Sequence, residues 1–289
     1  MTAMQRISGA PAIKPRKMDF PFSDITEKYF FDNNSIISTY MAALSATFPP
    51  GEKGFIDSVR NYRDQITDPE LQESIKGFIG QEGHHSYQHK EINKVLNDLG
   101  LFVHRIEKDL EKKITHDKGR LDKRDFLAST VGMEHITAIM AEYILENPHV
   151  LDPLPTSARE LLLWHAVEEI EHKAVAFDVY EACVGGRRRL HIVMGIQTVL
   201  FLWQVGLYQL SLLRWAKKMP SMRDVVGAAK FFLGKDGLAR NIVKPYLDYY
   251  RDDFHPWDND NTELINKWKE SRGYLLDVDL TETNIQGAT

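Results

Sequence analysis

The sequence has only one cysteine, Cys183, among its 289 residues. A single thiol cannot form an intramolecular disulfide or a cysteine-based zinc site. The N-terminal residues also lack the apolar core that characterises a secretory signal peptide. Both absences predict a cytoplasmic protein.

An excess of basic residues is missing as well. Lysine and arginine number 36 against 41 aspartates and glutamates, which gives a formal net charge of −5 at pH 7. Because nucleic-acid-binding proteins normally carry a basic surface, nucleic acid is not expected as a partner. With 43% hydrophobic and 27% charged residues, the composition is that of a folded globular protein.

Charge is absent from one long stretch, residues 192–213, which has arginines and lysines on both sides. Its 22 residues would be enough to span a bilayer as a helix. Three glutamines within the stretch, and basic residues at both ends, favour instead a helix that is buried in the protein or contacts a membrane peripherally. A spanning helix is the alternative.

Apolar residues recur at three- and four-residue spacing through most of the chain, which predicts an all-α protein. Capping residues and Pro/Gly breaks predict helices over 24–47, 52–68, 69–99, 103–115, 125–146 and 156–183, before the uncharged helix and two shorter amphipathic helices. We therefore expect an N-terminal segment (1–23), a metal-binding bundle (24–186), a helical extension packed on it (187–257) and a C-terminal tail (258–289).

The segment from His165 to His172 contains the most informative motif. At 100° per residue, Glu169 lies about 40° and His172 about 20° from His165 around the helix axis, so the three side chains form one narrow stripe. Two imidazoles and a carboxylate in a row are the donors of a metal site. Glu168 lies about 100° from its neighbour in the stripe, so we expect it to be exposed or to support the ligands.

A second cluster lies in the helix predicted for 69–99. His85 lies about 60° and His89 about 20° from Glu82, so either histidine shares a face with this glutamate. His85 is one turn from Glu82 and can reach the same metal ion, whereas His89 is about 10.5 Å from Glu82 along the helix axis. We predict His85 as the ligand and His89 as a supporting residue.

Two further glutamates complete the candidate set. Glu134 shares a helix face with small and apolar neighbours such as Ala138, where a carboxylate is costly to bury unless it is paired or bound to metal. Glu52 follows the predicted break at Pro49-Pro50-Gly51. Its pattern is the least specific, because an acidic residue in the first turn of a helix needs no function.

Together the candidates are one Glu from each of two helices and a Glu-x-x-His motif from each of two others, the arrangement that holds two metal ions between facing helices of a bundle. Four carboxylates would balance two divalent ions in a buried site. Ligands without thiolate favour iron or manganese, and zinc is also compatible. The predicted ligands are Glu52, Glu82, His85, Glu134, His165, Glu169 and His172, with His89, His135, Glu168 and His255 as candidates for supporting contacts.

Four motifs carry a family resemblance: Phe48-Pro-Pro-Gly-Glu52, Phe78-Ile-Gly-Gln-Glu-Gly-His-His85, His165-x-x-x-Glu169-x-x-His172 and Phe254-His-Pro-Trp257. With them the chain resembles, over about residues 20–270, the bacterial family described as predicted metal-dependent hydrolases of the ferritin-like superfamily. The ligand pattern is also similar to that of the di-iron arylamine N-oxygenases, which act on p-aminobenzoate-type substrates. The resemblance implies a ferritin-like bundle with additional C-terminal helices.

Two reactions are open for such a centre. Ferritin-like carboxylate bundles, as the resemblance implies, mostly use two reduced irons to reduce O₂ and oxidise a substrate, which requires an electron donor. A metal-dependent hydrolase would use a metal-bound water. Because the sequence has no Gly-x-Ser-x-Gly elbow and no His-Glu-x-x-His helix, we favour a di-iron oxidase or oxygenase. A hydrolase and a non-catalytic metal-binding protein are the alternatives.

The uncharged stretch 192–213 also bears on partners. A long apolar helix beside a metal bundle can wall a hydrophobic pocket or bring the site to a membrane. We therefore expect a small hydrophobic or aromatic substrate, with a peripheral membrane contact through these residues. A homodimer is left open, and so is whether His255 and Trp257 line the site or anchor the tail.

Overall fold

All regular secondary structure in the described part of the chain is helical. The computed structural model describes residues 11–272, and no strand occurs among them, which confirms the all-α prediction. The α-helices are α2 (Ser35–Arg60), α3 (Pro69–Asp98), α4 (His104–Arg120), α5 (Lys123–Glu146), α6 (Thr156–His172), α7 (Val175–Cys183), α8 (Arg187–Trp215), α9 (Met222–Leu233), α10 (Leu238–Asp248) and α11 (Thr262–Ser271). Short 3-10 turns occupy Phe22–Asp24 (η1), Arg63–Gln65 (η2), Pro148–Leu151 (η3) and Pro256–Asp258 (η4).

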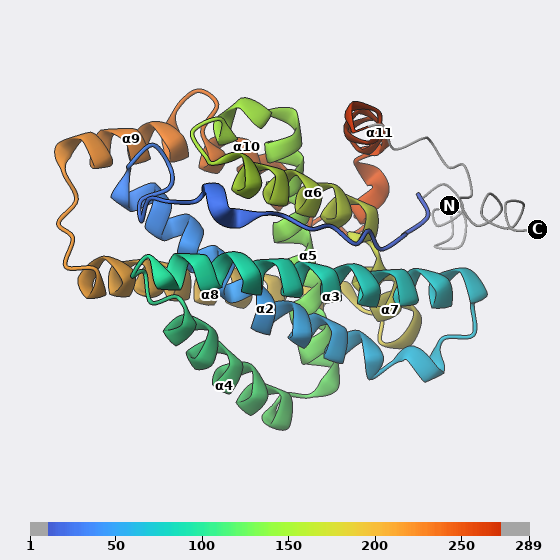
Figure 1. The fold of residues 1–289 in the computed structure, drawn as a ribbon. Helices are drawn as coiled ribbons and strands as arrows, with labels where there is room; N and C mark the ends of the chain where they lie inside the picture. The colour runs from blue at the N-terminus through green and yellow to red at the C-terminus, as the bar shows by residue number, and fades with distance from the viewer. Residues whose placement is uncertain (1–10, 273–289) are drawn as a thin grey trace, which may run out of the picture.

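Four helices form the bundle that carries the candidate ligands. α2 packs on α3, α5 packs on α6, and the two pairs meet through contacts of α3 with α6 and of α2 with α5. Figure 1 shows α3 beside α2 across the middle of the molecule, with α6 above them. α4 packs against α2, and α8 packs against both α2 and α5. The uncharged stretch therefore belongs to an outer helix of the bundle.

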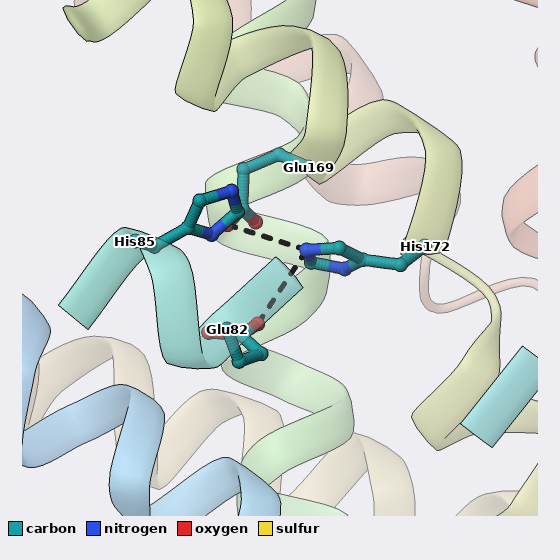
Figure 2. Close-up of side chains that lie close together, drawn as sticks. All are labelled: Glu82, His85, Glu169 and His172. Atoms are coloured by element: carbon teal, nitrogen blue, oxygen red, sulfur yellow. Dashed lines mark ion pairs between the residues drawn. The ribbon is translucent and has the colours of Figure 1, made fainter. Parts of the chain in front are cut away.

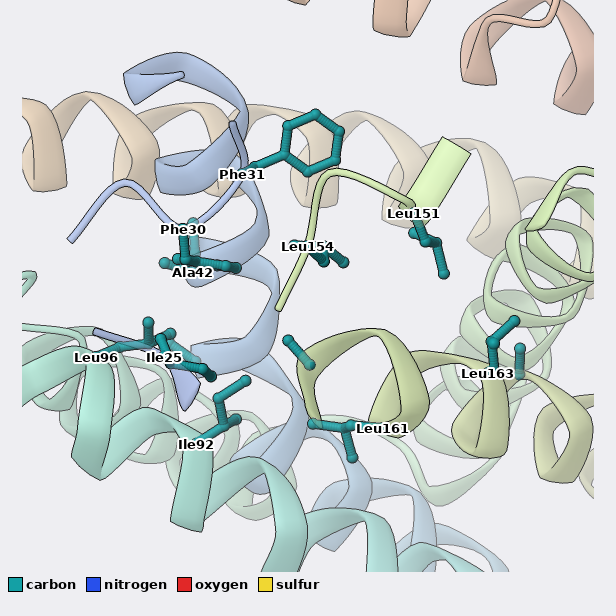
Figure 3. Packing of buried hydrophobic residues seen from close by; sticks show 14 of the residues in the cluster. Ile25, Phe30, Phe31, Ala42, Ile92, Leu96, Leu151, Leu154, Leu161 and Leu163 are labelled. Atoms are coloured by element: carbon teal, nitrogen blue, oxygen red, sulfur yellow. The ribbon is translucent and has the colours of Figure 1, made fainter. Parts of the chain in front are cut away.

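The buried apolar side chains form two clusters, and α3 contributes to both. Ile75 and Phe78 belong to one cluster, and Ile92 and Leu96 belong to the other. Figure 3 shows the second cluster, where these two residues of α3 lie near leucines of α6. A fully buried side chain of this size contributes roughly 1.5–3 kcal/mol to stability. The part of α3 between the clusters, residues 79–91, is held from both ends and carries the candidate ligands.

The predicted break at Pro49-Pro50-Gly51 is wrong, because α2 continues through it. A proline inside a helix removes the amide that would bond to the carbonyl four residues earlier. For Pro49 that carbonyl belongs to Ser45, and it accepts a hydrogen bond from Asn93 Nδ2 at 3.1 Å instead. A side chain of α3 replaces the missing backbone bond, and the spacing within a single helix gives no sign of this.

The predicted helix start at Asp24 is also wrong. α2 begins at Ser35, after Asn34, whose side chain accepts hydrogen bonds from the first free amides of the helix. Asp24 lies in η1 and accepts hydrogen bonds from the backbone amide and the hydroxyl of Ser157 in the first turn of α6. It therefore stabilises the start of a distant helix rather than its own.

Of the other predicted helix boundaries, some are confirmed and some are not. Asp68 caps the first turn of α3, and Gly100 follows the helix with a φ of +87°, so both predicted ends of that helix are confirmed. The helix predicted for 156–183 is divided into α6 and α7 at Lys173 and Ala174. α11 lies within the segment predicted as a polar tail. Residues 1–10 and 273–289 of the predicted terminal segments lie outside the described residues.

Candidate metal centre

The bundle brings the seven predicted ligands into its interior. α2 contributes Glu52, α5 contributes Glu134, and α3 and α6 contribute the other five. None of the seven is more than 5% exposed. Acidic residues are almost never this deeply buried unless they are paired or bound to a cation. The clustering of four carboxylates therefore needs a physical explanation.

One group of potential ligand atoms lies between α3 and α6. Glu82, His85, Glu169 and His172 each place an oxygen or nitrogen within 4.8 Å of the others. In Figure 2 the four side chains point toward one another across the gap between the two helices. His172 Nε2 is 3.5 Å from Glu82 Oε1 and 3.7 Å from Glu169 Oε1, and His85 Nδ1 is 3.7 Å from the same Glu169 oxygen.

A second group consists of Glu52, His89 and His165, whose ligand atoms also lie within 4.8 Å of one another. Glu169 connects the two groups, because its Oε1 lies 2.9 Å from His165 Nε2 as well as close to His85 and His172. The arrangement has room for two ions, with Glu169 within reach of both. His89, predicted as a supporting residue, lies within this group, but its two ring nitrogens contact Ser45 and His165.

Glu134 belongs to neither group but lies beside the first. His172 Nδ1–H donates a hydrogen bond to Glu134 Oε2 at 3.0 Å, which turns His172 Nε2 toward Glu82. The other oxygen of Glu134, Oε1, is buried and has no hydrogen-bond partner. Glu134 therefore orients His172 and also has an oxygen available for a cation.

Unpartnered polar atoms mark where a cation fits. Both carboxylate oxygens of Glu52 and of Glu82 are buried without a hydrogen-bond partner. The same is true of His85 Nδ1, Glu169 Oε2 and His172 Nε2. An unsatisfied buried donor or acceptor costs about 1–3 kcal/mol, and more for a charged group. Oxygen and nitrogen donors gathered in this way match the donor set of a divalent metal site, so these residues fit the predicted ions.

The carboxylates of this cluster repel one another. Burial, followed by the charges of Glu169 and Glu134, raises the pKa of Glu52 well above its usual value. Burial and the charge of Glu134 do the same to the pKa of Glu82, and burial raises the pKa of Glu134 to about 7. Against the effect of burial, Glu134 and Glu169 raise the pKa of His172 to about 9. Bound cations would remove this mutual repulsion.

A hydrogen-bond chain fixes which nitrogen of His165 faces the centre. Asn93 Nδ2 donates to the carbonyl of Ser45, so Asn93 Oδ1 is the acceptor for the Ser45 hydroxyl, at 2.7 Å. The Ser45 oxygen must then accept from His89 Nδ1–H, at 2.9 Å. Burial lowers the pKa of His89 well below its usual value, so the ring is neutral and its Nε2 accepts from His165 Nδ1–H, at 2.8 Å. His165 Nε2 is left as a lone-pair donor facing Glu169.

Glu168 supports His85, and Arg16, which was not predicted from the sequence, supports Glu168 in turn. His85 Nε2–H donates to Glu168 Oε2 at 3.1 Å, which leaves His85 Nδ1 facing the centre. Arg16, in the segment before η1, donates to Glu168 at 3.0 Å and to Glu171 at 2.8 Å. Gln81 also donates to Glu171, at 2.8 Å. No signal in the sequence connects Arg16 with residues about 150 positions later.

The other two candidates for supporting contacts lie elsewhere in the fold. His135 Nε2 bonds to the carbonyl of Pro245 at 3.1 Å, and its ring lies against Tyr249. His255 Nε2 pairs with Asp178 at 3.0 Å. Neither histidine belongs to a ligand group found among the described residues. Trp257 lies over the ammonium of Lys173, 4.1 Å from the ring centre, and so contacts the α6–α7 break.

A cavity of about 680 Å³ adjoins the second ligand group. Glu52, His165 and Glu169 form part of its wall, and most of the remaining wall is apolar, from α2, α4, α5 and α8, although α4 also contributes charged side chains such as Lys112 and Asp117. Cavities of 300–1,000 Å³ with a few converging polar groups are typical of sites for small organic ligands. The centre therefore has an adjacent space for a substrate.

Comparison with known proteins gives one match. The model of a protein family described as predicted metal-dependent hydrolase matches residues 14–260, which include every predicted ligand. No curated protein and no solved structure matches the chain. The ferritin-like and N-oxygenase resemblances therefore stay predictions.

Proposed function

The chain belongs to the family of predicted metal-dependent hydrolases, and on this premise we propose that it is an enzyme whose buried centre binds two metal ions and hydrolyses a substrate with an apolar portion. The observation that carries the proposal is the set of unpartnered carboxylate and imidazole atoms in two adjoining groups. Bound divalent ions would lower the pKa of a water molecule and polarise the bond to be cleaved.

Different residues would hold each of the two ions. Glu82, His85 and His172 would hold one ion, Glu52 and His165 the other, and Glu169 is placed to contact both. Glu168 keeps the lone pair of His85 Nδ1 directed into the centre through its bond to Nε2. The cavity would hold the apolar portion of the substrate and exclude water from it.

Oxidation by O₂ at a di-iron centre is the second candidate. It is favoured by a donor set of four carboxylates and no thiolate at the edge of a largely apolar cavity. This reaction would need O₂ and an external electron donor. The family description favours hydrolysis, so the sequence-based preference for an oxidase is not kept as the main hypothesis.

Metal stoichiometry tests the centre. We expect about two metal ions per chain by mass spectrometry after anaerobic purification, and Glu82→Gln should reduce this number to about one or less, because a carboxylate donor is lost. Glu73→Gln is the matched control, since Glu73 lies on the same helix but its side chain is 75% exposed. Wild-type protein without bound metal, even after reconstitution with iron, manganese or zinc, would contradict both candidate functions.

Activity then separates the two reactions. Hydrolysis of p-nitrophenyl esters by zinc- or manganese-loaded protein, lost in Glu82→Gln, would support the hydrolase. Rapid O₂ uptake by the iron-loaded protein with a reductant, stimulated by an apolar substrate and lost in the same variant, would support the oxidase. A protein that binds two ions and catalyses neither reaction would be a non-catalytic metal-binding protein.

A further inference from the structure

The outward face of α8 is apolar along its whole length. One described helix is long and apolar enough to cross a membrane, and it is α8. Eight large hydrophobic side chains on it are between 44% and 67% exposed, namely Ile192, Ile196, Val199, Leu200, Leu202, Trp203, Leu207 and Leu210. Single exposed hydrophobic residues are common, but a row of them along one helix marks an interaction surface. We call these eight side chains the α8 face.

The opposite side of α8 packs against α2 and α5 of the bundle. Met194, Val205 and Leu212 are buried against the bundle helices. Gln197 donates to the Ser129 hydroxyl of α5 at 2.6 Å, and Gln209 donates to the carbonyl of Ile36 in α2 at 2.9 Å. With one side bound to protein and the other apolar, α8 has the geometry of a helix that lies in a membrane interface.

Positive charge lies at both ends of the α8 face. Arg188 is exposed at the start of α8, and Arg214 and Lys217 are exposed at its end. None of the three forms an ion pair with another described residue. Basic side chains next to an apolar helix face are attracted to anionic lipid headgroups. In a two-fold pair of α8 helices, by contrast, a positive end would meet a positive end in either orientation.

The α8 face also borders the substrate cavity. Leu200, Trp203 and Leu207 belong to the exposed face and also line the cavity, whose wall extends to Glu52 and Glu169 at the metal centre. The cavity therefore runs from the apolar surface to the candidate ligands. A second protein copy on this face would cover the opening, whereas a bilayer would present lipid chains to it.

We propose that the α8 face docks on a bilayer that contains anionic lipid, and that the cavity takes up a single-chain amphiphile whose acyl or alkyl chain lies between α5 and α8 with its polar group at the metal centre. The substrate part of this inference rests on the proposed function. The docking part rests only on the exposed residues, their flanking charges and the cavity opening.

Vesicle flotation tests the docking. The metal-loaded protein should float with phosphatidylcholine vesicles that contain phosphatidylglycerol, and high salt should weaken its binding. Replacing Val199, Leu202 and Leu210 by serine should lower the bound fraction at least about tenfold, because these side chains belong to the α8 face but do not line the cavity. Tyr87→Ser is the control, since Tyr87 is 59% exposed on α3.

Three results separate the possible failures. Protein that stays with the soluble fraction, or a dimer that the triple serine variant converts to monomer, would overturn membrane docking. The cavity is tested with a fluorescent dodecanoic acid, which should bind to the protein and be displaced by unlabelled fatty acid. Met133→Trp, which fills the cavity, should abolish this binding. A protein that floats with the vesicles but shows no such displacement would overturn the assignment of the cavity to an amphiphile. Flotation and fatty-acid binding by a protein that holds no metal would support this inference while contradicting the proposed function.

Discussion

His165 is a predicted ligand whose ring is oriented by residues that do not bind the metal themselves. Its Nε2 faces the centre because its Nδ1–H is engaged by His89, and His89 is in turn oriented by Ser45. Sequence spacing predicted the stripe on α6 because the period of a helix determines which residues share a face. It could not identify Ser45, which lies on another helix and carries none of the usual ligand atoms.

Ser45→Ala should therefore lower metal affinity without removing a ligand. Loss of a contact that orients a ligating histidine typically reduces affinity about 10–100-fold. Competition with a chelator, read by metal content, measures the change. Ser86→Ala is the control, because Ser86 bonds only to the carbonyl of Pro49 at 3.3 Å. Equal affinity in the Ser45 variant and wild type would show that the hydrogen-bond chain does not orient His165.

The raised carboxyl pKa values predict how the metal-free protein responds to pH. A group with a higher pKa in the folded than in the unfolded state stabilises the fold at low pH, and this contribution is lost as the pH rises through the folded pKa. Glu82, with a raised pKa, Glu134, with a pKa of about 7, and His172, with a pKa of about 9, all act in this direction. The melting temperature of chelator-treated protein should fall between pH 7 and 8.

Two comparisons isolate this effect. His85 and His89 have lowered pKa values, so above pH 7 they are mostly neutral in both states and add little. The metal-loaded protein serves as the control, because bound cations keep the same carboxylates ionised throughout. Each proton involved changes the free energy of unfolding by about 1.4 kcal/mol per pH unit. A metal-free protein whose melting temperature rises over this window would contradict the prediction.

At the scale of elements, α2 shows where sequence reasoning is limited. Caps and glycines such as Asp68 and Gly100 act locally, so the ends of α3 could be predicted. Prolines act locally as well, but the helix can continue where a neighbour supplies the lost hydrogen bond, as Asn93 does for Ser45. That compensation depends on the contact between α2 and α3, which no single-helix pattern contains.

A double-mutant cycle tests this compensation. Asn93→Ala should destabilise the protein by about 1–3 kcal/mol, because it leaves the carbonyl of Ser45 without its donor. Pro49→Ala restores a backbone amide for that carbonyl, so the double variant should recover part of the loss. Free energies of unfolding from denaturant titrations measure the cycle. Strictly additive effects of the two substitutions would mean that Asn93 does not replace the missing bond.

At the scale of the whole molecule, a segment before the first helix closes one side of the bundle. Figure 1 shows it running in an extended form between α3 and α6. An added Cβ at Gly77 would lie 2.4 Å from the carbonyl oxygen of Ile13, and one at Gly80 would lie 2.4 Å from Pro15, so only glycine permits this approach. The role of residues 1–23 could not be predicted from the sequence, because such contacts join distant parts of the chain.

Arg16 is the electrostatic anchor of this segment. Arg16→Ala should cost about 3–5 kcal/mol, because the side chains of Glu168 and Glu171 are fully buried and would lose their cationic partner. Lys269, 3.2 Å from Glu171, would retain part of the pairing. Lys17→Ala is the control, since Lys17 is exposed beside it. Thermal denaturation compares the two, and an equal effect of both substitutions would argue against the anchor.

The unpartnered carboxylates at the centre have a consequence for the protein in its cell. Ions that bind only the folded chain shift the folding equilibrium by mass action, and their absence leaves the repulsion among Glu52, Glu82 and Glu134 in place. Cellular proteases act on the transiently opened fraction, which grows as stability falls. The steady-state amount of this protein should therefore follow the supply of its metal, even at constant synthesis.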